Sequence, residues 1–385
     1  MTPAPQPKSK IVICTHEFSP FRGGVATYSE ELATALQRAG EVVEVWAPDY
    51  GVPGAIDEFA FPVVRLPACG SLRFGDRVRF GFQVAARRKQ LEEATVVLTS
   101  VGAHTAFMIL VPLGQVKCRR LLSVVHGSEV LRFQKSGFWR FWARRFFPRV
   151  ECVFTVSKYS QSLMERSFLS ALARRIAIAP CACSAAAMRP CGTALRNNKD
   201  ERIRILTLAR VHPRKGQLDT ARALARLPAE LRSRIVYQIG GIGDTSYLRQ
   251  VAVVCREAGV GFEHLGQINP DTLAGTYHQC DICAMTSRSL PKSVEGFGIS
   301  YLEAGFHGKP VVGYRSGGAV EAVVDGETGL LVNEGDVTAL ANAFQRLLVD
   351  AALREQLGEG GRRHAAKFSW DATARVVTSV LEGAR

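Results

Sequence analysis

The run SVEGFGISYLEAGFHGKPVVGYRSGGAVEAVVDGETGLLV, residues 293–332, is the most informative part of this chain. Within it, Glu295 and Glu303 stand eight residues apart around a glycine turn, and residues 299–304 are predicted to form a helix directly after that turn. The unpaired N–H groups at a helix N-terminus carry partial positive charge and attract phosphate. Carboxylates accept hydrogen bonds from sugar hydroxyls. The run therefore indicates a site for a nucleotide sugar rather than for a nucleic acid.

This run resembles the signature of the retaining glycosyltransferases of family 4, which have the GT-B fold. The two glutamates, the following KPVVGYRSGG and the closing DGETGLLV carry the resemblance, which extends over residues 10–371. It implies an α/β protein with two Rossmann-like parallel-sheet domains facing a central cleft. The donor would lie mainly on the second domain and the acceptor on the first. The donor-binding residues implied within the run are Glu295, Phe297, Gly298, Ile299 and Glu303, with Glu295 also catalytic.

Length and charge agree with two domains and an anionic partner. A chain of 385 residues exceeds one ordinary hydrophobic core. Its formal net charge is +14, and residues 1–190 carry 25 Lys and Arg against 14 Asp and Glu. Such a basic first half implies a membrane surface, a phosphorylated acceptor or a nucleic acid as partner. No nucleic-acid recognition motif supports the last of these, so no nucleic-acid partner is expected.

The sequence also predicts where the protein works. The first ten residues, MTPAPQPKSK, lack the apolar core of a signal peptide. No uninterrupted apolar run approaches the roughly 20 residues that a spanning helix needs. The ten cysteines lack the spacing of a zinc site and are expected to be reduced thiols. We expect a cytoplasmic protein, or one that is peripheral on the inner face of the cytoplasmic membrane.

Alternating apolar runs and amphipathic stretches predict parallel α/β layers along the whole chain. The expected domains are an acceptor-side domain at 1–185, a connection at 186–200 and a nucleotide-sugar domain at 201–370. By resemblance, the helix within 371–385 is expected to cross back to the first domain. The expected strands are residues 10–16, 41–48, 94–100, 120–127, 152–157 and 174–180, then 202–210, 234–241, 261–266, 282–287, 309–315 and 329–332.

Two motifs of the first half are candidate site elements. Gly23 and Gly24 precede a predicted helix, where a glycine pair allows close backbone approach to phosphate. In the family, the matching loop faces the donor diphosphate; a plain strand-to-helix turn is the alternative. His126 ends an apolar strand, where ligands of open α/β sheets bind. The resemblance implies that its imidazole contacts the donor sugar and takes part in catalysis; the alternative is a structural histidine.

Two further motifs lie in the second half. Arg210 and Lys215 follow the first strand of this half, and two fixed cations there can neutralise a departing diphosphate. Gly266 and Ile268 lie at another strand end, where the family holds the nucleotide base through backbone groups. No Asp-x-Asp pair occurs in the sequence, so no metal ion or cofactor is expected beside a UDP- or GDP-sugar donor. The sequence does not select the sugar, the base, the acceptor or the oligomeric state.

The expected activity is metal-independent, retaining transfer of a hexosyl unit from a nucleotide-diphosphate sugar. The acceptor would be a hydroxyl of a glycan, of a lipid-linked saccharide or of a phospholipid. Two alternatives remain open: a nucleotide-sugar epimerase on the same scaffold, and a catalytically degenerate sugar-nucleotide binding protein. The joint presence of the histidine, the two cations and the two glutamates favours the transferase.

Residues 132–149, RFQKSGFWRFWARRFFPR, hold six basic residues and no acidic one. In a helix, Phe138, Trp139, Trp142 and Phe146 would share one face. This pattern is typical of a helix at a membrane surface, with aromatic rings at the headgroup level and cations toward anionic lipid. The alternative is that the aromatic rings pack in the core while the arginines are solvated. An anionic membrane surface is therefore a candidate partner, and it would suit a lipid acceptor.

Overall fold

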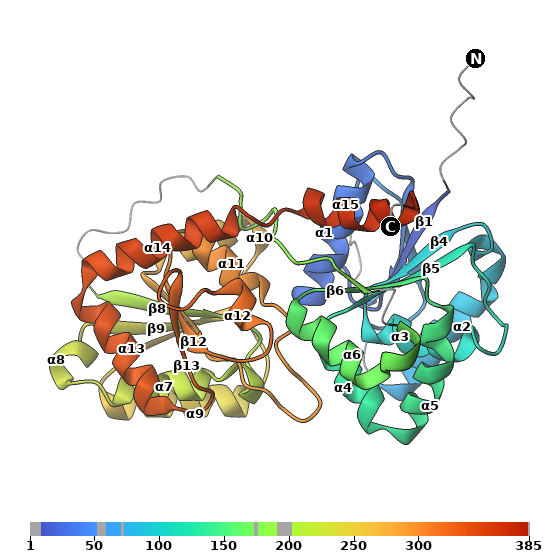
Figure 1. The fold of residues 1–385 in the computed structure, drawn as a ribbon. Coiled ribbons are helices and arrows are strands. Elements are labelled where there is room, and N and C mark those ends of the chain that lie inside the picture. The colour runs from blue at the N-terminus through green and yellow to red at the C-terminus, as the bar shows by residue number, and fades with distance from the viewer. Residues whose placement is uncertain (1–8, 52–58, 71–72, 173–175, 191–201, 384–385) are drawn as a thin grey trace, which may run out of the picture. The chain divides into compact units, whose positions relative to one another are not determined.

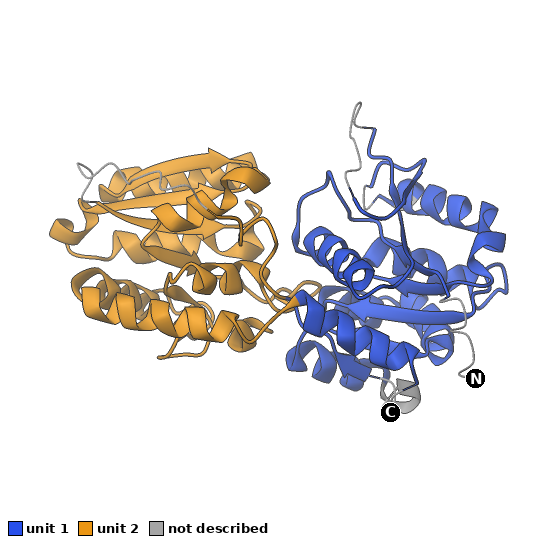
Figure 2. Ribbon diagram, turned by 90° about the horizontal axis from the view of Figure 1, so that it is seen from above, with its two compact units in different colours: residues 1–181, 370–385 blue, residues 182–369 orange. Residues whose placement is uncertain are grey.

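The computed structural model describes residues 9–51, 59–70, 73–172, 176–190 and 202–383. The chain divides into two compact units, Met1–Cys181 with Trp370–Arg385, and Ala182–Ser369 (Figure 2). The expected fold class is confirmed, because each unit is built on one parallel sheet flanked by helices (Figure 1). The division falls after Cys181, and most of the expected connection at 186–200 lies outside the described residues.

The first unit contains a seven-stranded parallel sheet in the order β3-β2-β1-β4-β5-β6-β7. Near-continuous Val, Ile and Leu runs form its inner strands because parallel strands are covered on both faces. The strands are β1 Ile11–Cys14, β2 Val43–Pro48, β3 Val63–Leu66, β4 Thr95–Leu98, β5 Arg120–Val125, β6 Cys152–Thr155 and β7 Ile176–Ile178. The short strand β3, at one edge of the sheet, was not among the expected strands.

The helices of this unit form two groups. Helix α15 (Trp370–Leu381) packs on α1 (Gly24–Arg38), so the terminal helix belongs to the first unit (Figure 1). The helices of the second group contact one another. They are α2 Phe74–Ala86, α3 Val101–Leu110, α4 Ser128–Lys135, α5 Gly137–Phe146 and α6 Lys158–Leu172. The short helices η1 (Arg88–Leu91) and η2 (Phe147–Arg149) complete the unit.

The second unit contains a six-stranded parallel sheet in the order β10-β9-β8-β11-β12-β13. Its strands are β8 Ile203–Leu208, β9 Ile235–Gly240, β10 Gly261–Gly266, β11 Ile282–Met285, β12 Val311–Tyr314 and β13 Gly329–Val332. Helices α7 (Gln217–Ala225), α9 (Thr245–Ala258) and α13 (Val337–Val349) cover one face (Figure 1). Helices α10 (Pro270–Gln279), α11 (Ile299–Phe306) and α14 (Ala351–Ala365) cover the other. Short η3 (Pro213–Lys215), α8 (Ala229–Arg232) and α12 (Ala319–Ala322) lie in connections.

Each strand order reverses direction once, and this reversal positions the candidate site. In the first sheet the chain moves outward from β1 on one side and from β4 on the other. In the second sheet, the chain likewise moves outward from β8 on one side and from β11 on the other. Ligands of open α/β sheets bind beyond the carboxyl ends of the strands at such a switch point. The loops after β8 and β11 are therefore where chemistry is expected in the second unit.

The aromatic segment at 132–149 differs in part from expectation. It contains the end of α4, all of α5 and then η2, with a break at Ser136, which caps α5 through Trp139 N. Phe138 and Phe141 are exposed. Phe146, which was placed on the exposed face, is wholly buried, because that side of α5 packs on η2 and the core. Within the described residues, no helix is long and apolar enough to cross a membrane.

A buried histidine of this unit leads to the first prediction. His104 is wholly buried on α3; its Nδ1 lies 2.7 Å from Ser100 O and its Nε2 2.7 Å from Ser123 Oγ. Burial lowers the pKa of His104 to about 4. The unfolded chain therefore binds more protons than the folded one between pH about 4 and 6.5. We expect the free energy of unfolding to fall by about 3 kcal/mol across this window as pH decreases. Urea unfolding should show a smaller fall in a His104→Gln variant; an equal fall would contradict the assignment.

Candidate active site

The loop after β8 is held close to the glycine loop after β9. Val211 N donates to Ile242 O at 3.0 Å, and Val211 forms an isolated bridge with Gly243. A Cβ atom at Gly241 would lie 2.1 Å from Ala209 O, so only glycine allows this approach. These contacts fix the segment that carries Arg210 and Lys215 at the carboxyl edge of the second sheet.

Glu295 is the centre of a buried charge cluster at this edge. Its Oε2 accepts from Lys215 Nζ at 2.7 Å, from Ser287 Oγ at 2.8 Å and from Arg214 Nη1 at 3.2 Å. Burial alone would raise the pKa of Glu295, but Lys215 and Arg214 outweigh it and hold the pKa at about 2. The carboxylate is therefore ionised at neutral pH, and the cluster keeps a net positive charge. These three contacts use Oε2, and a ligand hydroxyl could donate to Oε1.

Arg214 and Ser287 were not among the predicted site residues. The role of Arg214 becomes visible through its contact with Glu295, which lies 81 residues away in the sequence. Ser287 follows β11 and precedes Glu295 by eight residues, so sequence spacing gave no reason to select it. The structure thus adds a second cation and a hydroxyl to Lys215 and Glu295, which were predicted separately as site residues.

A second ion pair fixes the loops that carry this cluster. Asp219, buried on α7, accepts from Arg288 Nε at 2.5 Å and from Tyr314 OH at 3.2 Å. The backbone N–H of Arg288 donates to Arg214 O at 2.7 Å. Arg288 therefore ties the loop after β11 both to α7 and to the cation loop. Residues 287–293, SRSLPKS, supply this tie.

The turn before α11 has the backbone that the sequence predicts. Gly298 caps α11 with φ 98°, and a Cβ atom there would lie 2.3 Å from the Tyr301 ring. Gly318 approaches the same turn so closely that a Cβ atom would lie 1.9 Å from Gly296 O. Phe297 is buried against Phe368, and Ile299 begins the helix. The expected glycine turn followed by a helix is confirmed.

Glu303 is buried in the second turn of α11, and both of its oxygens have partners. Oε1 accepts from Ser184 Oγ at 2.5 Å, and Oε2 accepts from Tyr277 OH at 2.9 Å. Burial raises the pKa of Glu303, although both hydroxyl donors oppose this effect. His307 stacks on the Tyr277 ring. A carboxylate has about four acceptor positions, so Glu303 retains capacity for a ligand hydroxyl.

The other predicted residues of this unit lie along the same edge of the sheet. Arg210 is exposed, and its backbone carbonyl accepts from Gln217 Nε2 at 3.0 Å. Gly266 ends β10 with φ 66°, and Ile268 lies against Gly240, where a Cβ atom would be 2.9 Å from its side chain. Arg210 is therefore placed to meet an anion from solvent, while Lys215 is already paired with Glu295.

Gly23, Gly24 and His126 lie in the first unit. Gly24 begins α1, and Gly23 precedes it with extended backbone. His126 follows β5, and its ring lies edge-on to Tyr28, 5.0 Å away. The His126 backbone N–H donates to the buried Glu129 carboxylate, which was not predicted. Glu129 therefore holds the loop in which His126 is positioned.

His126 provides the second prediction. Its Nε2 lies 2.9 Å from Thr99 O. Because a carbonyl only accepts, Nε2 carries the proton of the neutral ring and Nδ1 is the acceptor. If Nδ1 accepts from a sugar hydroxyl, His126→Ala should lower turnover by about tenfold or more while nucleotide affinity is unchanged. Steady-state kinetics and calorimetry of the two proteins test this. Normal turnover in the variant would make His126 structural.

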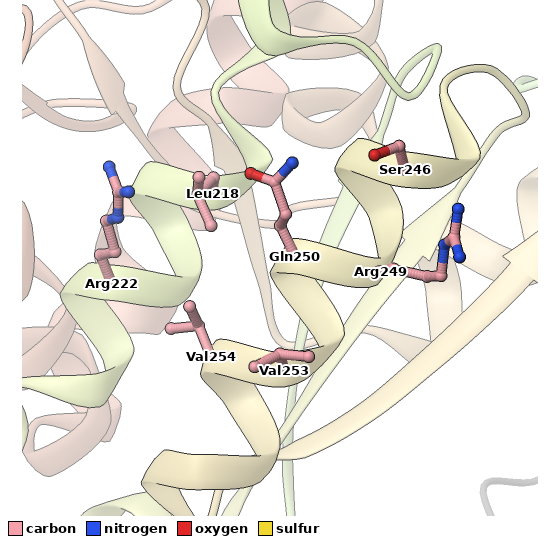
Figure 3. Close-up of a pocket in the computed structure, with 7 residues that line it drawn as sticks. All are labelled: Leu218, Arg222, Ser246, Arg249, Gln250, Val253 and Val254. Carbon is pink, nitrogen blue, oxygen red and sulfur yellow. The ribbon is translucent and has the colours of Figure 1, made fainter.

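A surface groove in the second unit lies apart from these residues. It runs between α7 and α9, with Leu218 and Arg222 on one side and Gln250 and Val254 on the other (Figure 3). None of the predicted site residues lines this groove. It therefore plays no part in the assignment of the site.

Two family models match the chain, one on each half. The description "Glycosyltransferase Family 4" matches residues 22–186, and "Glycosyl transferases group 1" matches residues 195–364. A GDP-mannose-dependent alpha-(1-6)-phosphatidylinositol monomannoside mannosyltransferase of Mycolicibacterium smegmatis is 31% identical over 97% of this chain and 99% of its own. The protein of that name from Mycobacterium tuberculosis is 29% identical, over 97% of this chain and 98% of its own.

Solved structures show the same fold. A sucrose-phosphate synthase from Thermosynechococcus elongatus has a TM-score of 0.83 at 22% identity, over 98% of this chain and 99% of its own. HepE of Anabaena, in complex with UDP and glucose, has a TM-score of 0.77 at 20% identity, over 97% of this chain and all of its own. With both halves matched and a relative aligned over nearly its whole length, this chain belongs to the family 4 glycosyltransferases and has the GT-B fold.

Proposed function

We propose that this glycosyltransferase moves a mannosyl unit from GDP-mannose to a hydroxyl of a phosphoinositol lipid, with retention and without a metal ion. The cluster of Lys215, Arg214 and Glu295 carries the proposal, because it unites cations for a diphosphate with a carboxylate for a sugar. The mycobacterial relatives, whose names specify GDP-mannose and a phosphatidylinositol mannoside, supply the substrate class.

In the proposed mechanism, residues of the second unit stabilise the negative charge of the leaving diphosphate. As the bond from the sugar to the diphosphate breaks, negative charge grows on the phosphate oxygens. The ammonium group of Lys215 and the guanidinium group of Arg210 stabilise that charge, since preorganised cations act most strongly on developing charge. The leaving phosphate oxygen takes the proton of the acceptor hydroxyl on the same face of the sugar. This route needs no nucleophilic side chain.

Donor and acceptor class can be tested in one assay. The purified protein is supplied with radiolabelled GDP-mannose or UDP-glucose, with phosphatidylinositol vesicles, with phosphatidylcholine vesicles or without acceptor. We expect labelled lipid only with GDP-mannose and phosphatidylinositol, and equal turnover in a chelator. Labelled lipid that forms with UDP-glucose but not with GDP-mannose would overturn the donor assignment. Conversion of the donor sugar without transfer would favour the epimerase alternative, and binding of GDP-mannose without any turnover would favour the binding-protein alternative.

Peripheral membrane binding is the third prediction and rests on α5. Phe138 and Phe141 are 56% and 48% exposed on this helix, beside exposed Arg140, Arg144 and Arg145. An exposed pair of phenylalanines flanked by cations fits an anionic lipid surface.

We expect the wild type to sediment with phosphatidylinositol vesicles, and more weakly at high salt. The double variant Phe138→Ser, Phe141→Ser should bind these vesicles at least about tenfold more weakly than the wild type. The matched control is Val349→Ser, which changes an apolar residue of the second unit that is 66% exposed. Equal vesicle binding by the double variant and the control would contradict a role for α5.

A further inference from the structure

Tyr28 on α1 lies between His126 and the start of α15. Its ring is nearly perpendicular to the imidazole of His126, with 5.0 Å between the ring centres. It is also nearly perpendicular to the indole of Trp370, with 5.2 Å between the centres. Both Tyr28 and Trp370 are buried. A close-packed side chain can shift only when its neighbours shift as well, so Tyr28 limits how far the His126 ring can turn.

Both segments that join the two units contact Tyr28. The chain leaves the first unit after Cys181 and returns to it at Trp370. Two residues before Cys181, the backbone carbonyl of Ala179 accepts from Tyr28 OH at 3.1 Å. At the return, Trp370 packs on the Tyr28 ring, and α15 then packs along α1 (Figure 1). One side chain of α1 therefore holds the outgoing and the returning segment together.

A second set of contacts connects α1 to His126 through Thr99. The carbonyl of Thr99 accepts from His126 Nε2 at 2.9 Å. The hydroxyl of Thr99 lies 2.7 Å from the hydroxyl of Ser29, the neighbour of Tyr28 on α1. The hydrogen bond fixes one nitrogen of the imidazole, and the Tyr28 ring restricts rotation about that point. Together they present His126 Nδ1 in one direction.

We propose that Tyr28 and Trp370 are positioning residues for His126, through which the two segments joining the units set the direction of its Nδ1. The inference rests on the proposed function and adds residues that act through another side chain. A displacement of about 1 Å at a reacting centre can lower a rate by up to about 10²-fold. A shift in either joining segment would reach His126 through Tyr28, which both segments contact.

The first arm of the test is a double-mutant cycle in the full-length chain. Tyr28→Leu and Trp370→Ala remove the ring contacts, whereas Tyr28→Phe and Trp370→Phe keep an aromatic ring. We measure kcat, and KM for GDP-mannose, for each variant with and without His126→Ala. Tyr28→Leu and Trp370→Ala should each lower kcat by about tenfold at unchanged KM. Added to His126→Ala they should cost almost nothing more, because residues that act through His126 are not additive with it. The two Phe variants should keep most of the wild-type kcat.

The second arm observes His126 without turnover. In protein labelled with ¹⁵N-histidine, the Nε2–H signal of His126 is assigned by its loss in His126→Ala. We expect this signal in the wild type and in Tyr28→Phe, because the hydrogen bond to Thr99 O slows exchange of the proton with water. It should disappear in Tyr28→Leu and in Trp370→Ala, although Trp370 packs on Tyr28 and acts on the imidazole only through it. If the protein does not transfer mannose, this arm alone decides.

The matched control is Phe80→Leu, which removes part of another buried ring of the first unit. It should lower stability in urea unfolding while the His126 signal and kcat stay unchanged. An equal cost of Tyr28→Leu with and without His126→Ala would show that Tyr28 only supports the fold, and would overturn the proposal. An unchanged signal in Tyr28→Leu and Trp370→Ala, the same loss in Phe80→Leu, or no signal in the wild type would do so as well. If Tyr28→Leu does not fold, Trp370→Ala decides by the same criteria.

Discussion

Replacing Lys215 or Arg210 by alanine should lower turnover by about 10²-fold or more, the scale observed when one preorganised electrostatic donor is removed. The two variants should differ in stability. Lys215 is paired with buried Glu295, so Lys215→Ala removes one of the cations that neutralise that carboxylate and should also lower the free energy of unfolding. Arg210 is exposed, so Arg210→Ala should lose turnover at unchanged stability.

The difference between these two variants separates catalysis from folding. Turnover is measured at saturating donor, and stability by urea unfolding, in both variants and in the control Arg256→Ala. Arg256 is an exposed arginine of α9 and should change neither quantity. Full activity of Arg210→Ala or of Lys215→Ala would remove that residue from diphosphate stabilisation. Complete loss of wild-type activity in chelator would show that a metal ion, rather than these cations, carries the charge.

Most strands of both sheets could be predicted because they are short apolar runs bounded by turn residues, and the edge strand β3 was the exception. Such runs depend on local sequence alone, and they appear as β1, β5, β9 and β12 within a few residues of their expected ends. The turn at Gly298 was predictable for a similar reason, since a glycine with positive φ must stand where α11 begins. Local chemistry fixes both features, so one sequence contains enough information.

The partners of the site residues could not be predicted in this way, because they come from distant parts of the chain. Ser184 lies 119 residues before Glu303, and Arg288 lies 69 residues after Asp219. Only the packing of α11 and of the loop after β11 brings them together. Helix α5 shows the same limit of prediction from the sequence. Helical periodicity groups Phe138 with Phe146, but it does not determine which side packs on η2 and becomes buried.

Replacing Glu303 by alanine should weaken nucleotide binding by about 1.5–3 kcal/mol, the range for a hydrogen bond to a charged group. The physical reason is that a carboxylate at this point of α11 can accept from ribose hydroxyls. In the structure its oxygens already accept from Ser184 and Tyr277, so a ribose must either use the remaining acceptor positions or displace Ser184. These two routes predict different results for Ser184→Ala.

Calorimetry with GDP distinguishes the routes. If ribose uses the remaining positions of Glu303, Ser184→Ala should leave the affinity nearly unchanged. If ribose displaces Ser184, removing that hydroxyl frees an acceptor in advance, and the affinity should rise. Tyr277→Phe controls for the loss of the other donor, and unfolding measurements confirm that each variant is folded. Unchanged GDP affinity in a folded Glu303→Ala variant would mean that Glu303 only ties Ser184 and Tyr277 to α11, because the buried carboxylate would then have no ligand contact to lose.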